Sequence, residues 1–207
     1  MTSSATSEIV DAHHHLWDPG QRQYPFLDVP EHASIRRRFG PAELAAAVVP
    51  HGIAQTVVVQ AAPDLAETEH LLEVAGSEPL IAGVVGWIDC ATLDPEGQLD
   101  RLLAHPHGHL LRGIRAMAQD QPDPGWLTRP ALSRAAAAIG DRGLVCELLI
   151  RPAQAAAAQV LVGRRPEVTF IVDHAAKPAI TTGALEPWSS AIQTLAGAAH
   201  VSCKVSG

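Results

Sequence analysis

Three consecutive histidines near the start of the chain have a spacing that can bind a metal ion. His13, His14 and His15 follow the apolar pair Ile9-Val10, which predicts that they end a β-strand. Because side chains alternate between the two faces of a strand, His13 and His15 are expected on one face and His14 on the other. Two imidazoles on one face can bind a single divalent ion, each through one ring nitrogen. The alternative is a polar strand end without metal, since short metal-binding patterns often arise by chance.

Further candidate residues stand at the ends of later predicted strands. His174 follows the apolar run 168–173, and in a parallel sheet this strand end would meet the same rim as His13 and His15. It would then supply a third metal ligand, whereas the alternative is a histidine that bonds a neighbouring carbonyl. Asp173 is predicted on the opposite face, where it would orient a neighbour. The predicted substrate-binding residues share this placement, and they are Gln60, Trp87, Arg115, Lys177 and Lys204.

Several of these candidates have a structural alternative. Arg115 suits a carboxylate or a developing oxyanion, because its guanidinium donates two parallel hydrogen bonds, and its alternative is an ion pair with a nearby aspartate. Lys204 interrupts one apolar run and Glu147 lies within another, so each is expected to be paired if it is buried. Trp87 fits the core as well as it fits a pocket.

The chain alternates between strand-like and helix-like segments. Seven apolar runs rich in β-branched residues are predicted strands, and they cover residues 8–13, 55–60, 80–87, 111–115, 144–150, 168–173 and 201–205. The helices predicted between them start at Pro41, Asp64, Asp94, Arg129, Pro152 and Glu186. Asp64, with Glu67 three residues later, predicts a start of the capping-box type.

Repeated strand–helix units predict a parallel sheet with right-handed crossovers. An open doubly wound sheet would carry a glycine-rich turn after its first strand, where this chain carries histidines. The predicted fold class is therefore α/β, a TIM-like (β/α) barrel that lacks the eighth βα unit. Residues 9–207 would form this incomplete barrel, after a disordered tail of residues 1–8. The longest loops, 16–40 and 116–129, follow strand ends, where barrel enzymes build their active sites.

Composition and charge argue against several kinds of partner. The chain has 207 residues, of which 47% are hydrophobic, and a formal net charge of −7. This acidic balance disfavours nucleic acid and anionic membranes as partners. No apolar run reaches the roughly 18 residues that span a membrane. Three widely spaced cysteines, Cys90, Cys146 and Cys203, are predicted to be buried free thiols, which is typical of a cytoplasmic protein.

Several short motifs, taken in order along the chain, resemble one family. They are Ile9-Val10-Asp11-Ala12-His13-His14-His15-Leu16-Trp17-Asp18, Tyr24-Pro25-Phe26-Leu27, Gly86-Trp87-Ile88-Asp89, Arg112-Gly113-Ile114-Arg115, Asp173-His174-Ala175-Ala176-Lys177-Pro178 and Cys203-Lys204-Val205-Ser206-Gly207. The chain thus resembles the amidohydrolase-related lactonases (amidohydrolase 2). This branch includes L-fuconolactonase, L-rhamnonolactonase and 2-pyrone-4,6-dicarboxylate lactonase.

The resemblance implies a TIM-like barrel hydrolase that opens a lactone by attack of water. It places the family's ligands for one divalent ion, most often zinc, on His13, His15 and His174, and its strand-end arginine on Arg115. Some lactonases of this branch work without metal, so the resemblance leaves cofactor dependence open. The chain departs from the family pattern at Ala116, where a histidine is common. The family's general-base aspartate on strand 8 has no counterpart before the last residue.

The expected function is a lactone hydrolase of carbohydrate metabolism that acts on a sugar-acid or related acidic lactone. Lys177 would join Arg115 in holding the acyl oxygen or a substrate carboxylate. Two alternatives stay open, namely a non-catalytic barrel remnant without the general base and an amidohydrolase-type decarboxylase. An incomplete barrel would also expose the edges of its first and last strands, which predicts either poor solubility or self-association along such an edge.

Overall fold

The computed structural model describes residues 9–206, which form two compact units. Unit 1 extends to Gly86 and also contains Leu103–Leu111, whereas unit 2 contains Trp87–Leu102 and the residues from Arg112 onward. The tail predicted at residues 1–8 lies outside the described residues.

Unit 1 contains a parallel sheet of three strands, in which β2 lies between β1 and β3. Its elements are β1 (Ile9–His14), α1 (Pro41–Val48), β2 (Ile53–Val59), α2 (Leu65–Ser77) and β3 (Ile81–Gly86). Helix α2 packs closely on β3 at Gly86, where a Cβ atom would come within 2.2 Å of Thr68 Cγ2. A glycine is therefore needed at this point of helix–strand contact.

The start of α2 differs from the predicted capping box. Asp64 does cap the helix, because its side chain accepts a hydrogen bond from the Ala66 N–H at 2.9 Å. Glu67 does not return a bond to Asp64, whose own N–H is already bonded to the Ala62 carbonyl at 2.8 Å. The Glu67 carboxylate turns instead to the N–H groups of Ala61 and Ala62. Asp64 is therefore the N-cap as predicted, but its bond goes to the second residue of the helix rather than the third, and neither bond of a capping box is made.

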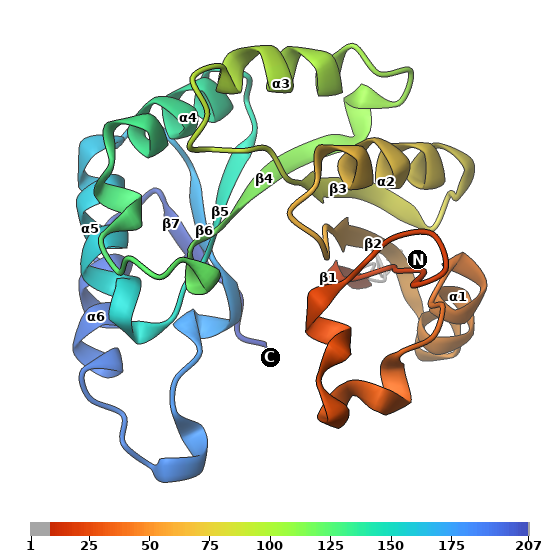
Figure 1. Cartoon of the computed structure of the whole chain (residues 1–207), viewed down its shortest axis with the longest axis horizontal. Coiled ribbons are helices and arrows are strands. Elements are labelled where there is room, and N and C mark those ends of the chain that lie inside the picture. Colours follow the sequence, from red (N-terminus) through yellow and green to blue (C-terminus); the bar gives the residue numbers. More distant parts are fainter. Residues whose placement is uncertain (1–8, 207) are drawn as a thin grey trace, which may run out of the picture. The chain divides into compact units, whose positions relative to one another are not determined.

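Unit 2 contains a parallel sheet of four strands in chain order. Its strands are β4 (Leu111–Met117), β5 (Val145–Leu149), β6 (Phe170–Val172) and β7 (Val201–Cys203), and its helices are α3 (Pro95–Leu103), α4 (Pro130–Asp141), α5 (Ala155–Arg164) and α6 (Trp188–Ala196). Figure 1 shows α4, α5 and α6 side by side along one face of this sheet. The core between them includes Ile114, Leu148 and Phe170, which are fully buried, and Ala136 and Ala158 allow the helices to approach closely.

The long loop after β1 is folded rather than extended. Trp17 and Phe39 pair as a two-residue antiparallel bridge at the base of the loop, with N···O distances of 3.1 and 2.9 Å. Tyr24 and Leu27 are buried inside it, and Ile35 packs against the same apolar cluster. The Tyr24–Leu27 motif therefore contributes to the packed interior of this loop.

The described residues contain no helix that is both long enough and apolar enough to cross a membrane. Cys90 and Cys146 are buried free thiols, and burial raises the pKa of Cys90 to about 12. Cys203 is exposed, so the prediction of burial was wrong at this position. The reason is that β7 is the last strand of its sheet and is paired only with β6 in the described part of unit 2.

Candidate active site

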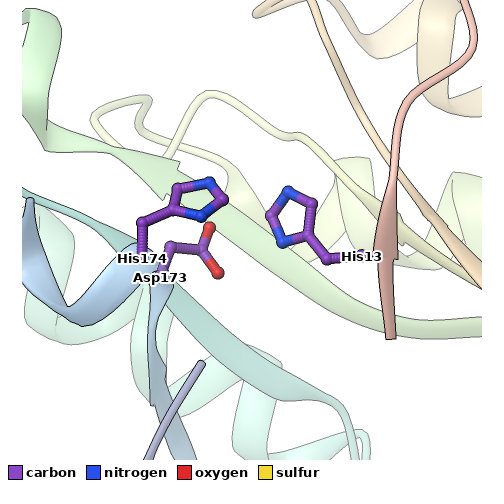
Figure 2. Close-up of side chains that lie close together, drawn as sticks. All are labelled: His13, Asp173 and His174. Atoms are coloured by element: carbon purple, nitrogen blue, oxygen red, sulfur yellow. The ribbon is translucent and has the colours of Figure 1, made fainter. Parts of the chain in front are cut away.

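The histidines of β1 form a close pair in unit 1. The Nε2 atoms of His13 and His15 lie 3.2 Å apart, and the two rings meet edge to face. Figure 2 shows the His13 ring projecting from β1. A tetrahedral ion holding two imidazole nitrogens at about 2.0–2.1 Å would separate them by about 3.3 Å. The observed spacing therefore suits one shared ion.

The hydrogen bond on the other side of His15 supports the same interpretation. His15 Nδ1 lies 2.8 Å from the carbonyl oxygen of Val59, at the end of β2. Because a carbonyl can only accept, Nδ1 carries the proton and Nε2 presents its lone pair toward His13. Metal-binding histidines commonly donate their second ring N–H to a carbonyl in this way.

His14 contacts a different partner and has a structural role. Its Nε2 lies 3.0 Å from the hydroxyl of Thr56, which donates its own proton to the Leu80 carbonyl. Burial lowers the pKa of His14, so the neutral ring is favoured. His14 thus bonds a different partner from the His13–His15 pair, which agrees with the predicted alternation of side chains between the two faces of β1.

In unit 2, three buried charged side chains and one partly buried lysine form what we call the charge quartet: Arg115, Glu147, Asp173 and Lys204. Arg115 and Glu147 are register partners on β4 and β5. Arg115 Nη1 lies 3.5 Å from Asp173 Oδ2, and Lys204 Nζ lies 3.3 Å from Asp173 Oδ1. Lys204 Nζ also lies 2.5 Å from Glu147 Oε1. Two cationic side chains therefore face two carboxyl groups within hydrogen-bond or ion-pair distance.

Burial dominates the titration of the quartet's Glu147. It raises the pKa of this carboxyl to about 7, and the negative charge of Asp173 acts in the same direction. Lys204 and Arg115 oppose this shift because their positive charges favour the ionised form. The expectation that Glu147 and Lys204 would be paired if buried is confirmed, since they pair with each other.

His174 lies in a left-handed turn directly after β6. The φ angles of His174, Ala175, Ala176 and Lys177 run from 48° to 57°, although none of them is glycine. Figure 2 shows Asp173 and His174 projecting from adjacent positions of the chain here. Each such residue costs about 1–2 kcal/mol in backbone energy, and strain of this kind is often found at functional sites.

Neighbouring segments of unit 2 hold this turn in place. The Ala175 N–H donates to the Lys204 carbonyl at 2.9 Å, and the Trp188 indole N–H donates to the Ala175 carbonyl at 2.5 Å. His174 Nδ1 lies 3.0 Å from the hydroxyl of Ser206. Burial, aided by the nearby cations, lowers the pKa of His174. The ring is therefore favoured in the neutral form that binds metal.

The remaining predicted pocket residues are partly or fully buried near strand ends. Gln60 is fully buried directly after β2, and Trp87 is half-buried directly after β3. Lys177 lines a cavity of about 680 Å³ in unit 2 together with His174 and Trp188. Burial and the nearby Arg151 lower the pKa of Lys177.

Comparison with known proteins identifies the family. The family model described as amidohydrolase matches residues 10–207. The chain belongs to the amidohydrolase family. An L-fucono-1,5-lactonase of Burkholderia ambifaria is 36% identical over 202 residues, which cover 96% of this chain and 67% of that protein.

Solved structures agree with this family assignment. An amidohydrolase of Burkholderia multivorans, crystallised with bound zinc, is 30% identical with a TM-score of 0.87, over 97% of this chain and 70% of that one. A TIM-barrel protein of Bordetella bronchiseptica, 17% identical, matches in fold with a TM-score of 0.62 over 96% and 75% of the two chains. The predicted TIM-like class is confirmed, with seven strands within residues 9–206.

Within this amidohydrolase, each unit brings part of the predicted set together. Unit 1 pairs His13 with His15, and unit 2 joins Arg115 to Lys204 through Asp173. The convergence of His174 on the ion of the unit 1 pair stays a prediction. The sequence reasoning missed Trp188 and the left-handed turn, because alanines carry no signal for that backbone conformation.

Proposed function

We propose that this amidohydrolase hydrolyses a sugar lactone by attack of water on the lactone carbonyl. The observation that carries the proposal is the His13–His15 pair, whose nitrogen spacing of 3.2 Å suits a shared divalent ion. The relative named L-fucono-1,5-lactonase, 36% identical, supports a lactone as the substrate. The zinc in the Burkholderia multivorans amidohydrolase supports zinc as the ion.

In this proposal the three histidines His13, His15 and His174 hold the ion. When bound, a divalent ion lowers the pKa of a water ligand and polarises the carbonyl. The His15–Val59 bond fixes the tautomer that can bind, and the left-handed turn after β6 fixes the direction of His174. Gln60, Trp87 and Lys177 are proposed to contact the sugar part of the substrate.

The charge quartet favours a neutral lactone over an acidic one. A substrate carboxylate needs an uncompensated cation, but Arg115 and Lys204 already bind the buried carboxylates Asp173 and Glu147. Among the predicted cationic residues this leaves Lys177 alone to meet a substrate carboxylate. We therefore propose that Arg115 and Lys204 stabilise the single charge that develops on the acyl oxygen, rather than a permanent anion. This narrows the expected sugar-acid or acidic lactone to an uncharged sugar lactone.

The test is lactone hydrolysis by the purified chain loaded with zinc. Acid release from L-fucono-1,5-lactone and from 2-pyrone-4,6-dicarboxylate would be followed with a pH indicator. We expect turnover of the first lactone and little of the second. The variants His13→Asn and His15→Asn should lose zinc, measured by elemental analysis, and with it at least a hundredfold in rate. His51→Asn, an exposed histidine of unit 1, is the matched control.

Each contradicting result has a distinct meaning. Zinc retained by both variants would remove the pair from the metal site. Preferred turnover of the dicarboxylate would overturn the argument from the quartet. Binding of lactones without hydrolysis would support the non-catalytic remnant, and carbon dioxide release from an aromatic acid would support the decarboxylase.

We also propose self-association along the outer strands and a cytoplasmic location. The outer strands carry exposed side chains, Ile9 and Val10 on β1 and Ser202 and Cys203 on β7, and open strand edges favour pairing. The three free thiols support a reducing compartment. Analytical ultracentrifugation tests the first proposal. A monomer whose Cys203 reacts at once with a maleimide would contradict pairing at β7.

A further inference from the structure

Glu67 is a buried carboxylate that the proposed chemistry does not use. It lies in the first turn of α2 with 1% of its surface exposed. Its Oε2 atom accepts hydrogen bonds from the N–H of Ala61 at 2.9 Å and from that of Ala62 at 2.7 Å. These two residues directly follow Gln60 at the end of β2. Glu67 therefore fixes the backbone of the turn that carries Gln60.

The same carboxylate faces the long loop that follows β1. The hydroxyl of Tyr24, a buried residue of that loop, lies against Glu67. Burial and the Glu67 charge raise the pKa of Tyr24 to about 12, so the hydroxyl keeps its proton. Tyr24 and Glu67 also line one cavity. An ion pair between Arg22 and Asp64, the N-cap of α2, makes a second link nearby.

A cavity separates part of the loop from α2. Its volume is about 400 Å³, and it is bordered by Trp17 and Phe39 on the loop side and by Leu71 and Val74 on the helix side. The loop is attached to this region by the polar links at Asp64 and Glu67 and by a buried apolar cluster in which Tyr24 and Leu27 pack with Ala61 and Ala62.

We infer that Glu67 is a positioning residue that holds the loop of residues 16–40 against the turn bearing Gln60. One carboxylate thereby couples two segments that lead away from the carboxyl ends of β1 and β2. The consequence for catalysis rests on the proposed function, because it assumes that Gln60 contacts substrate. The predicted attachment of the loop does not depend on the proposed function.

Three variants separate the two halves of this role. Tyr24→Phe removes the link to the loop and leaves the bonds to Ala61 and Ala62. Glu67→Gln weakens both halves, because the amide replaces a charged acceptor by a neutral one. Glu73→Gln, the same change at a largely exposed position of α2, is the control.

The first readout needs no substrate. Trypsin cleavage after the exposed residues Arg36, Arg37 and Arg38 reports opening of the loop. We expect cleavage to accelerate about three- to tenfold in Tyr24→Phe and at least tenfold in Glu67→Gln, and to stay unchanged in Glu73→Gln. Hydrogen exchange at the amides of Ala61 and Ala62 should accelerate in Glu67→Gln only.

The second readout is lactone kinetics. If Gln60 contacts substrate, Tyr24→Phe and Glu67→Gln should each raise KM several-fold. Glu67→Gln should also lower kcat. A lower melting temperature with unchanged cleavage and exchange would reduce Glu67 to a merely structural residue and overturn the inference. Accelerated cleavage with no lactone turnover in any variant would keep the positioning role and reject the proposed function instead.

Discussion

The histidine pair of unit 1 and the charge quartet of unit 2 solve opposite physical problems. His13 and His15 are half-buried: the His13 backbone N–H donates to Asp11 of the same strand, and the His15 ring bonds the Val59 carbonyl at the end of β2. The quartet places three ionisable side chains in the interior and Lys204 at its margin, and each depends on the others for partners. A substitution in the histidine pair should therefore lower the free energy of unfolding only slightly. Loss of one member of the quartet should lower it much more.

The histidine pair is thus suited to bind a ligand, whereas the members of the quartet are needed together for the stability of the fold. A half-exposed imidazole pays a small desolvation cost and keeps its lone pair available for a ligand. A buried ion pair is weak evidence for stability, but removal of one partner leaves a charge that nothing compensates. Variants of the two regions should therefore differ in kind as well as in size.

Lys204→Met should have the largest effect on stability. It leaves the carboxylates of Glu147 and Asp173 buried without their shared cation, and loss of one partner from a buried pair costs about 3–5 kcal/mol. Urea unfolding followed by circular dichroism measures the loss. Lys177→Met, at a half-buried lysine of the same unit, should cost less than about 1 kcal/mol. Equal losses at both lysines would contradict the idea of a mutually dependent quartet.

Glu147→Gln should change how stability depends on pH. The pKa of Glu147 rises from 4.5 to about 7 in the fold, so between these values the folded chain keeps a proton that the unfolded chain has released. The free energy of unfolding therefore falls as the pH rises through this window. The variant cannot ionise and should lack this decline, which amounts to about 1–3 kcal/mol. Urea midpoints at pH 5 and pH 8 test it, and parallel profiles of the two proteins would refute it.

Ala175→Gly should be tolerated or mildly stabilising, in contrast to an ordinary helix position. Ala175 has a φ of 48°, which glycine adopts without penalty, and the gain offsets the entropy that glycine loses on folding. Ala137→Gly within α4 is the matched control and should cost about 1 kcal/mol. A loss at Ala175 as large as that at Ala137 would show that the turn is not strained.

His13→Asn should have the smallest effect on the stability of the metal-free chain, below about 1 kcal/mol, because this side chain is only half-buried. Thermal unfolding with and without zinc measures it. Zinc should raise the melting temperature of the unaltered chain and not that of the variant, since only the folded pair binds the ion. A large loss without zinc would place His13 with the quartet as an architectural residue.

The order and type of the elements could be predicted from the sequence. Prolines at the starts of α1, α3 and α4, and Asp64 before α2, marked helices where the structure has them. The limits of two elements differ from the prediction. Residues 152–154 form a 3₁₀ turn before α5, and β7 ends at Cys203 rather than at residue 205. Such limits depend on which neighbours compete for the last backbone hydrogen bonds.

What the sequence by itself determined is local. The pairing of His13 with His15 follows from the two-residue period of a strand, which needs no knowledge of distant segments. The tertiary structure alone decided the charge quartet, because Arg115, Glu147, Asp173 and Lys204 come from four different strands or strand ends. It also decided that Glu67 bonds to Ala61 and Ala62 rather than to Asp64, because the Asp64 N–H had already found a backbone partner. Spacing along a chain fixes the direction of a side chain, but its partner depends on what the fold brings beside it.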